Sequence, residues 1–390
     1  MKQGWEIKKL KDVTSLITDG DWIESRHQSE DGIRLIQTGN VGNGFFKAKD
    51  DRPHFISEET FDVLGCTEIF EGDCLVSRLP DPVGRACLIP EMDCRMITAV
   101  DCSIIRFNEI LVPDFFVYYS QSSKYQNEIS NKTTGTTRKR ISRKNLEMIP
   151  IHVPPIAEQE KIVAELDCLS EIIEKKKQQL KELDNLAQSI FYEMFGDPVE
   201  NDKGWEKKRL DEIGKVITGN TPSTKDESNY SSADYCFVKP SDIAKDSISY
   251  ISNTEFYVSE KAYINSRQLP KGSVLTTCIG IIGKVGILQK DATCNQQINA
   301  IIPNKDIDAK FLAHVLFMIR DVLTDVANAP IVPIINKKEF SSVSIPVPLF
   351  SLQQDFASKI ESIEKQKELI AQSIKETETL FNSRMDYYFN

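Results

Sequence analysis

The chain repeats itself at a spacing of about 200 residues, and this repeat constrains its fold more than any other feature. Residues 4–18 read GWEIKKLKDVTSLIT and residues 204–218 read GWEKKRLDEIGKVIT, so Trp5 matches Trp205 at an offset of 200. Self-similarity at a fixed period indicates a duplicated structural unit. Because the chain has 390 residues, we expect two units of about 195 residues each.

The similarity continues to the end of both halves. Gly72–Leu75 (GDCL) corresponds to Gly272–Leu275 (GSVL), and Gln159 corresponds to Gln353. The offset has drifted from 200 to 194 by the last of these pairs, as small insertions and deletions in loops would cause. The two halves are therefore predicted to share one architecture.

Each half begins with a stretch of mixed pattern. Short β-rich runs bounded by Gly, Asn, Asp and Pro predict strands joined by turns. These runs are Arg34–Gln37, Asp73–Ser77, Ser103–Phe107 and Ser273–Thr277, while Phe115–Gln121 and Phe311–Leu323 look helical. The expected fold class is α+β, with two similar globular parts.

Each half ends in a stretch typical of a long helix. Apolar residues recur there at steps of three and four, which is a heptad seam. The seam residues are Ile162, Leu166, Leu169, Ile173, Leu180, Leu183 and Ile190 in the first half, and Phe356, Ile360, Ile363, Ile370, Ile374 and Phe381 in the second. About forty helical residues would form a rod of about 60 Å.

An apolar seam of this kind must be covered. We expect the two helices to pair as an antiparallel coiled coil, which would relate the globular parts by a pseudo-two-fold axis. The alternatives are that each helix packs on its own globular part or on a second chain. Lys176 and Lys367 interrupt the seams, and polar residues there can fix register and partner. The predicted domains are residues 1–155, 156–196, 197–349 and 350–390, the second and fourth being the helices.

Composition excludes several classes of protein. A net charge of −10 argues against a general nucleic-acid coat, although a basic face on an acidic body remains open. No run of about 18 apolar residues occurs, and the first residues lack the apolar region of a secretory signal, so we expect a cytoplasmic protein. The nine cysteines include no C-x-x-C pair, which favours reduced thiols and no metal.

One segment is strongly basic. Residues 129–146, ISNKTTGTTRKRISRKNL, contain six cations and no acidic residue. Hydroxyls, backbone amides and cations together suit phosphate oxygens, and Arg can also reach guanine edges. The candidates are Lys132, Thr134, Gly135, Thr136, Thr137, Arg138, Lys139, Arg140, Arg143 and Lys144. A solvated loop is the alternative. The counterpart in the second half, Asn328–Ile345, is less basic and offers Lys337 and Lys338.

Other candidate DNA contacts lie in loops after predicted strands or beside turns. In the first half they are Gln37, Thr38, Asn40, Arg78 and Arg85, and in the second half Lys239, Ser241, Asp242, Lys284, Gln296 and Gln297. Gln side chains can read adenine. Ordinary surface polarity is the alternative for each of them.

Catalytic motifs are missing. Gly280–Lys284 superficially resembles a phosphate-binding loop, but Cys278 occupies the place of its first Gly and Val285 the place of its hydroxyl residue. The four histidines are far apart in the sequence, and no G-x-S-x-G or H-E-x-x-H pattern occurs. We therefore expect a non-catalytic protein with no catalytic residues.

Taken together, these features resemble a known family. The repeated opening Gly-Trp-x-x-x-x-Leu, the loop Gly135–Ser142 (GTTRKRIS) and Val153-Pro-Pro-Ile156-x-x-Gln159 before a long helix are similar to the specificity subunit of type I restriction–modification systems. The second copy, Val347–Gln353 (VPLFSLQ), lacks the second Pro.

The resemblance implies two target-recognition domains that each read one half of a bipartite double-stranded DNA site. It implies that the paired helices set the spacer and dock two methyltransferase subunits, with restriction motor–endonuclease subunits joining the complex. S-adenosylmethionine, ATP and magnesium would then belong to the partner subunits. The alternatives are a DNA-binding regulator that acts alone, which needs no long helices, and a protein scaffold, which would not bind DNA in a salt-sensitive way.

Overall fold

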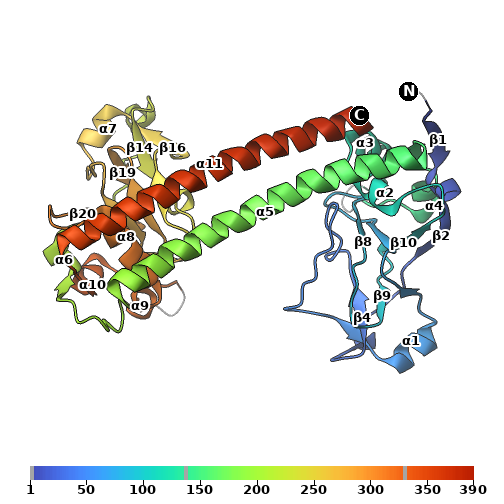
Figure 1. Cartoon of the computed structure of the whole chain (residues 1–390), viewed down its shortest axis with the longest axis horizontal. Coiled ribbons are helices and arrows are strands. Elements are labelled where there is room, and N and C mark those ends of the chain that lie inside the picture. The colour runs from blue at the N-terminus through green and yellow to red at the C-terminus, as the bar shows by residue number, and fades with distance from the viewer. Residues whose placement is uncertain (1–3, 136–138, 328–331) are drawn as a thin grey trace. The chain divides into compact units, whose positions relative to one another are not determined.

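The computed structural model of the chain describes residues 4–135, 139–327 and 332–390. It consists of two compact units. Unit 1 comprises Met1–Lys175 and Ser373–Asn390, and unit 2 comprises Lys176–Gln372 (Figure 1). Both long helices are divided between the two units.

Unit 1 contains three sheets. The first has the order β2 (Thr14–Asp19), β10 (Cys102–Phe107), β7 (Cys74–Ser77) and β8 (Ala86–Leu88), with antiparallel neighbours. The second has the order β3 (Gln28–Ser29), β5 (Phe55–Ile56), β4 (Ile33–Ile36), β9 (Met96–Thr98) and β6 (Glu68–Ile69), with β4 and β9 parallel. The third pairs β1 (Glu6–Lys9) with β11 (Pro150–Val153).

Short helices complete unit 1. They are α1 (Glu58–Leu64), α2 (Pro113–Tyr119), α3 (Ser123–Lys132) and α4 (Arg143–Glu147), with 3₁₀ turns η1 (Leu10–Val13) and η2 (Ser25–His27). Phe115 and Phe116 of α2 are fully buried in the main core, together with Tyr125 of α3. Met385 and Phe389, from the end of the chain, belong to the same core, which ties the second long helix to unit 1.

Unit 2 repeats this plan. Its main sheet has the order β13 (Gly214–Thr218), β20 (Ile298–Pro303), β17 (Val274–Thr277), β18 (Val285–Leu288) and β15 (Ser249–Ile251). A second sheet has the order β16 (Phe256–Val258), β14 (Tyr235–Val238) and β19 (Ala292–Cys294), and β12 (Lys207–Arg209) pairs with β21 (Ser344–Pro346). The helices are α6 (Leu210–Ile213), α7 (Glu260–Ile264), α8 (Ala309–Met318), α9 (Arg320–Asp325) and α10 (Lys337–Ser342), with 3₁₀ turns η3 (Glu227–Tyr230) and η4 (Pro240–Asp242).

The strand orders confirm the duplication. The order β2-β10-β7-β8 in unit 1 recurs as β13-β20-β17-β18 in unit 2. The order β5-β4-β9 likewise recurs as β16-β14-β19, and β4–β9 and β14–β19 are both parallel pairs. The expected α+β class and the predicted strands and short helices are therefore confirmed.

The two long helices are α5 (Ile156–Phe195) and α11 (Phe350–Phe389), in the ranges where the sequence predicts them. In unit 2, Phe356 packs on Phe191 and Phe195 with ring centroids 5.6 and 5.3 Å apart, and Lys367 binds Asp184 at 2.8 Å. Higher numbers on α5 thus meet lower numbers on α11, so the segments pair antiparallel. In unit 1, Glu165 accepts hydrogen bonds from Arg384 and Tyr388.

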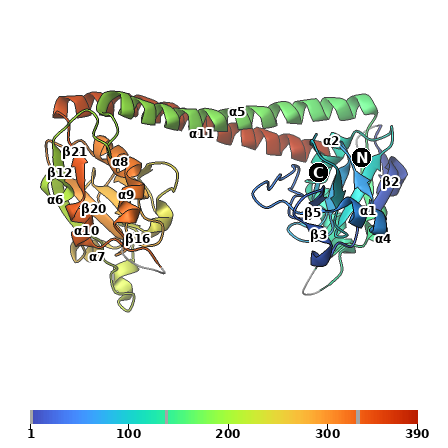
Figure 2. The same cartoon turned by 90° about the horizontal axis from the view of Figure 1, so that it is seen from below.

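All thirteen predicted seam residues are buried or half-buried, as a heptad seam requires. Pairing and packing on the globular part occur together, although the sequence presents them as alternatives. Phe191 and Phe195 of α5 also contact Phe311 of α8, with centroids 6.0 and 4.9 Å apart. Within each unit, the segments of α5 and α11 lie along one side of the globular part (Figure 2). Among the described helices, none has a window apolar enough to cross a bilayer.

Candidate nucleic-acid interface

Several strands of unit 1 end at one rim. The amide of Gly20, after β2, donates to Cys102 O, and that of Asp21 donates to Thr98 O at the end of β9, both at 2.9 Å. The amide of Ala99 donates to Ile36 O at the end of β4 at 3.0 Å. We call the residues that follow these strands, 20–22, 37–41, 78 and 99–101, rim 1.

Unit 2 builds the same rim from the corresponding strand ends. The amide of Gly219 donates to Ile298 O, that of Asn220 donates to Cys294 O, and that of Asn295 donates to Val238 O. We call residues 219–221, 239–243, 278 and 295–297 rim 2. Five of the candidates that the sequence gives in unit 2 belong to it: Lys239, Ser241, Asp242, Gln296 and Gln297.

A glycine is required where the chain crosses each rim. A Cβ atom on Gly20 would lie 2.4 Å from Thr98 O and 2.5 Å from Ala99 O. One on Gly219 would lie 2.3 Å from Cys294 O and 2.2 Å from Asn295 O. These are backbone atoms that cannot move aside, so the close approach itself selects glycine at the same place in both repeats.

The loops after β4 and β14 are built alike. Asn40 Oδ1 accepts the Gln37 amide at 3.0 Å, and Asp242 Oδ2 accepts the Lys239 amide at 2.7 Å. Asn40 is buried, and Asp242 Oδ1 also accepts the Glu255 amide. These two side chains form hydrogen bonds within their own turns, a usual role of Asn and Asp. They shape the loop, and their predicted contact with DNA stays a prediction.

Arg85 and Lys284 stabilise these two loops by hydrogen bonds to their carbonyl groups. Arg85 donates from Nη2 to Thr38 O at 2.8 Å and from Nε to Val41 O at 2.7 Å. Lys284 Nζ donates to the equivalent carbonyls, Pro240 O and Ile243 O, both at 2.8 Å. Arg85 is buried and Lys284 half-buried. Both cations thus support the loop from within the protein, and their predicted contact with DNA stays a prediction.

Arg78 is also buried, with 4% of its surface exposed. Its guanidinium pairs with Asp19 at 3.0 Å and donates to Val100 O, and burial lowers its pKa. Asp19 in turn accepts the Ser103 hydroxyl at 3.1 Å. Direct base reading does not fit this position, because a buried paired cation is costly to extract. Arg78 joins β7 to the rim.

The basic segment forms a hairpin attached to rim 1. Thr134 and Arg140 exchange backbone hydrogen bonds of 2.9 Å in both directions. Arg140 binds Asp101 at 3.0 Å, and the Ile141 amide donates to Arg78 O at 3.2 Å. We call the described residues of this bridge and its ends, 134, 135, 139 and 140, the basic hairpin. The candidates Thr136, Thr137 and Arg138 lie outside the described residues, and Gly135 is exposed beside them.

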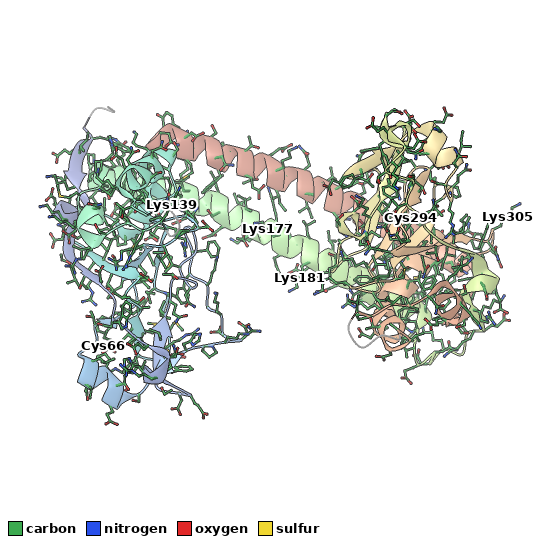
Figure 3. All side chains as sticks on the ribbon, turned by 180° about the vertical axis from the view of Figure 1, so that it is seen from behind. Cys66, Lys139, Lys177, Lys181, Cys294 and Lys305 are labelled. Atoms are coloured by element: carbon green, nitrogen blue, oxygen red, sulfur yellow. The ribbon has the colours of Figure 1, made fainter. Side chains whose placement is uncertain are left out.

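The fold supplies counter-charges that the sequence segment lacks. Lys132 binds Glu128 at 3.3 Å, and Arg143 binds Glu147 at 3.4 Å. With the Arg140–Asp101 pair, three of the described cations have carboxylate partners. The view of this segment as uncompensated charge is therefore wrong for those three. Lys139, labelled in Figure 3, and Lys144 are exposed cations in the described part of the segment.

The counterpart in unit 2 meets its rim at the same point. The Ile335 amide donates to Cys278 O at 3.0 Å, as the Ile141 amide does to Arg78 O. Lys337 and Lys338, at the start of α10, are exposed. Glu339 caps the Asn336 amide of that helix at 3.0 Å. Position and role correspond between the repeats, but fewer cations are present here.

The remaining candidates are accessible to different degrees. Gln37 and Thr38 are half-buried on rim 1, and Ser241 is exposed on rim 2. Lys239 lies over the ring of Phe256, 3.0 Å from its centroid. Gln296 is exposed and accepts the Thr221 hydroxyl at 2.7 Å, whereas the half-buried Gln297 accepts from Asn295 at 2.9 Å.

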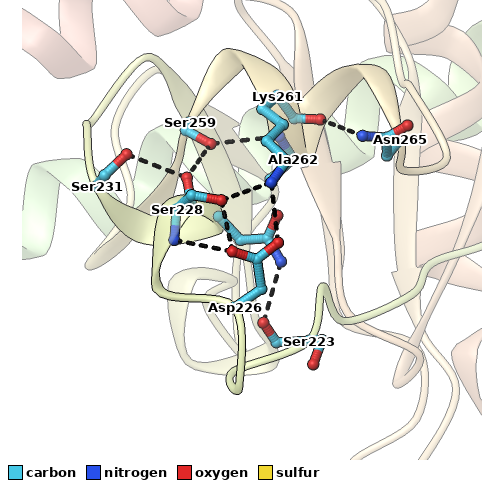
Figure 4. A network of polar contacts seen from close by, with 9 residues as sticks. Ser223, Asp226, Ser228, Ser231, Ser259, Lys261, Ala262 and Asn265 are labelled. Atoms are coloured by element: carbon cyan, nitrogen blue, oxygen red, sulfur yellow. Dashed lines mark hydrogen bonds and ion pairs between the residues drawn. The ribbon is translucent and has the colours of Figure 1, made fainter.

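A polar network fixes the loop that follows Thr221 (Figure 4). Asp226 binds Lys261 at 2.9 Å and accepts the Ser228 hydroxyl at 2.5 Å. Ser259 donates to Ser228 O at 2.8 Å and caps α7 through the Ala262 amide. Lys261 is thereby neutralised, and the loop carrying Thr221 is anchored to α7.

Sequence reasoning missed two rim residues, Trp22 and Thr221. Trp22 is 67% exposed, more than any other described tryptophan. Both follow the shared rim glycine by two residues, at Gly20 and Gly219. At the offset of 200 that pairs Thr18 with Thr218, Gly20 falls opposite Asn220, so a one-residue shift is needed before Trp22 and Thr221 align.

No group of His, Cys, Asp and Glu suited to a metal ion occurs among residues 4–135, 139–327 and 332–390. The thiols of Cys66 and Cys294, labelled in Figure 3, are buried. Burial raises the pKa of Cys66 to about 11 and that of Cys294 to about 12. Both therefore stay protonated and unreactive near neutral pH.

The chain was compared with known proteins. The profile of the type I restriction modification DNA specificity domain matches residues 2–185 and 202–379. The specificity subunit of the type I restriction enzyme MjaIX from Methanocaldococcus jannaschii is 31% identical over 193 residues, 48% of this chain and 44% of that protein. The EcoKI specificity subunit from Escherichia coli is 23% identical, over 80% of this chain and 69% of that protein. The chain spans less than half the length of two of these relatives: 44% of the MjaIX specificity subunit and 36% of the type I restriction enzyme HindI specificity subunit.

Solved structures show the same fold. A chain from a study of complex assembly and conformational transition of the type I R-M system superposes with a TM-score of 0.62 at 18% identity, covering 100% of this chain and 98% of that one. The type I S subunit from M. genitalium gives 0.57 at 13% identity, covering 98% and 95%. Since the profile matches both repeats over nearly their whole length, the chain belongs to the family of type I restriction modification DNA specificity domain proteins.

Proposed function

We propose that the chain is the sequence-specific DNA-binding specificity subunit of a type I restriction–modification complex, and that each unit reads one half of a bipartite site. One observation carries this proposal: the same rim is built twice. Gly20 and Gly219 approach the same strand ends, and Arg85 and Lys284 hold the same loop. The exposed residues that these scaffolds present are different, as two readers of different base sequences require.

The residues on and near the two rims fall into two groups. Arg78, Arg85, Asn40, Asp242 and Lys284 are engaged with the protein itself. Lys139, Lys144, Gln296, Lys337 and Lys338 have exposed side chains and are the residues we assign to DNA. The cations would bind phosphates and fix the position of the duplex, and Gln296 would contact a base edge.

We further propose that α5 and α11 set the spacing between the half-sites and dock two methyltransferase subunits. Antiparallel pairing within unit 2 supports this, because it is the pairing that a dyad-related reader needs. Lys177 and Lys181 project from α5 (Figure 3) and belong to the charged face that would meet a partner. The chemistry of methyl transfer and cleavage, with S-adenosylmethionine, ATP and magnesium, would reside on methyltransferase and motor–endonuclease subunits.

The test is to express the chain with the methyltransferase gene of its host in a strain that lacks modification, and to sequence the methylome. The expected result is one bipartite motif with a constant spacer. Adding seven residues to α5 between Glu174 and Lys181 should change the spacer or abolish modification. An unmodified genome, with no salt-sensitive binding of the chain to DNA, would contradict the proposal and favour a protein scaffold. DNA binding without co-purification of a methyltransferase would favour a regulator that acts alone.

A further inference from the structure

Trp22 and Thr221 occupy the same place in the two repeats. Gly20 and Gly219 donate to Cys102 O and Ile298 O, and the next residues, Asp21 and Asn220, donate to the ends of β9 and β19. The residue after each pair is therefore fixed by the same scaffold. Unit 1 presents an indole there, and unit 2 presents a hydroxyl bound to Gln296.

The exposure of Trp22 needs an explanation. Its neighbour Ile23 turns inward and packs on the core formed by Ile33, Leu35 and Ile97, while the Trp22 ring turns outward and is 67% exposed. Trp5, in contrast, is only 8% exposed. Leaving a large aromatic ring in water forgoes the favourable free energy of burying its apolar surface. A partner that covers the ring recovers that free energy.

The surroundings of Trp22 indicate a polyanionic partner. Asp21 O accepts the Val100 amide at 2.9 Å, and the next residue, Asp101, holds Arg140 of the basic hairpin. Lys139 is exposed in that hairpin. Asp101 of the rim pairs with Arg140, and Asp19, which precedes the rim, pairs with Arg78.

Two acidic groups near the ring are likewise engaged. The Asp21 carboxylate turns toward the second sheet, where it accepts the Thr67 amide at 2.8 Å. Glu24 binds Arg26 at 2.9 Å and accepts weakly from the indole N–H at 3.4 Å. An exposed aromatic ring on a rim to which a basic hairpin is attached is a combination that suits nucleic acid.

We propose that Trp22 and the Thr221–Gln296 pair are the equivalent specificity-determining contacts of the two half-sites. The indole of Trp22 packs against a sugar and base edge, such as a thymine methyl, in the half-site of unit 1. The Gln296 amide, oriented by Thr221, hydrogen-bonds to a base edge in the half-site of unit 2. This inference rests on the proposed function.

The first test uses the full chain and a library of duplexes with random sequence, from which bound molecules are selected and sequenced. Wild-type protein should enrich a bipartite motif. Trp22→Ala should relax one half of that motif and lower affinity about fivefold or more, and Gln296→Ala should relax only the other half. Ser241→Ala, an exposed change on rim 2, should leave the first half unchanged.

The second test separates folding from contact. Quenching of tryptophan fluorescence by an enriched duplex should disappear in Trp22→Phe and persist in Trp205→Phe. If the wild type enriches no motif, both the proposed function and this inference are wrong. If the wild type enriches a motif that Trp22→Ala leaves unchanged in sequence and affinity, the proposed function stands and the inference is wrong. Loss of methyltransferase binding without a change in the motif would instead assign Trp22 to a protein contact.

Discussion

Arg85 and Lys284 are different cations that hold the same loop, since each donates to the carbonyls of equivalent residues, Thr38 and Val41 in unit 1 and Pro240 and Ile243 in unit 2. Arg85→Met should therefore destabilise the fold by about 2–4 kcal/mol, because it strands buried carbonyl groups without donors. Arg85→Lys should cost clearly less, because Lys284 shows that an ammonium group reaches both acceptors. Urea denaturation measures both.

Lys139→Met serves as the control, because Lys139 is exposed and surface substitutions usually change stability by less than about 0.5 kcal/mol. The supporting role would be refuted by the reverse result: an Arg85→Met protein as stable as the wild type that binds DNA with a smaller salt dependence. Arg85 would then be a phosphate contact.

Gln159 and Gln353 link each long helix to its globular part through identical bonds. Gln159 Oε1 accepts the Val112 amide at 2.8 Å, and its Nε2 donates to Ile110 O and Pro154 O at 2.9 and 2.8 Å. Gln353 bonds in the same way to Asp308 N, Asp306 O and Pro348 O. Gln159→Leu should lower the free energy of unfolding by about 2–3 kcal/mol, since it leaves buried backbone groups unpaired.

The matched control for this prediction is Gln178→Leu on the exposed face of the same helix. Its unfolding free energy should stay within about 0.5 kcal/mol of the wild type. Equal losses in the two variants would mean that the introduced leucine itself lowers stability, and that the bonds of Gln159 contribute nothing particular.

The repeat and the heptads were sufficient to predict the duplicated fold and the two long helices. Gln159 and Gln353 align in the sequence and make the same bonds, because a duplicated unit keeps its internal contacts. The seam residues of both helices are buried or half-buried because a period of three and four places those residues on one face of a helix. Both inferences use only local spacing and comparison of the halves.

The candidate interface was harder to predict, because burial of a charged side chain depends on groups far away in the sequence. Arg78 and Arg85 lie beside Gly and Pro turns, which suggested a surface, yet their partners are Asp19 and the carbonyls of residues 38 and 41. Asp101 likewise neutralises Arg140 from outside the basic segment. No local pattern reveals such partners, and the equivalence of Trp22 and Thr221 emerges only from the backbone bonds of Gly20 and Gly219, because it shifts the repeat by one residue.

Lys139 and Lys144 are expected to contribute charge alone. Replacing both by Ala should weaken binding to duplex DNA at low salt and reduce the slope of log K against log salt by about 2, since each phosphate contact contributes about 0.9. Thermal unfolding should not change, because both side chains are exposed. Fluorescence anisotropy at several salt concentrations gives the slope.

Lys305→Ala is the control for that measurement. Ile298, at the start of β20, meets Gly219 of rim 2, so the other end of this strand lies away from the rim. Lys305, labelled in Figure 3, follows that other end. Its loss should leave the slope unchanged. A slope that falls as much for Lys305→Ala as for one hairpin lysine would point to a general charge effect and remove the hairpin from the interface.

His314 of α8 is buried in unit 2 against Phe356 of α11, with ring centroids 5.0 Å apart. Its Nδ1 lies 2.8 Å from Lys310 O and must therefore carry the proton that it donates. Asp184, Glu364 and Lys367 line the same cleft. Burial, the largest effect, lowers the pKa of His314 from 6.5 to about 4.

This shift makes stability depend on pH with a definite sign. The unfolded chain binds a proton at His314 below about pH 6.5, while the folded chain resists it until about pH 4, so acid favours unfolding in that window. A shift of this size corresponds to about 3 kcal/mol. His314→Asn keeps a donor for Lys310 O but does not titrate, so its stability deficit relative to the wild type should shrink by about that amount between pH 7 and pH 4. Carboxylates titrate in both proteins and cancel in the difference measured by urea denaturation. A deficit that stays constant across the range would mean that His314 is protonated in the folded protein, which the packing of Phe356 against its ring argues against.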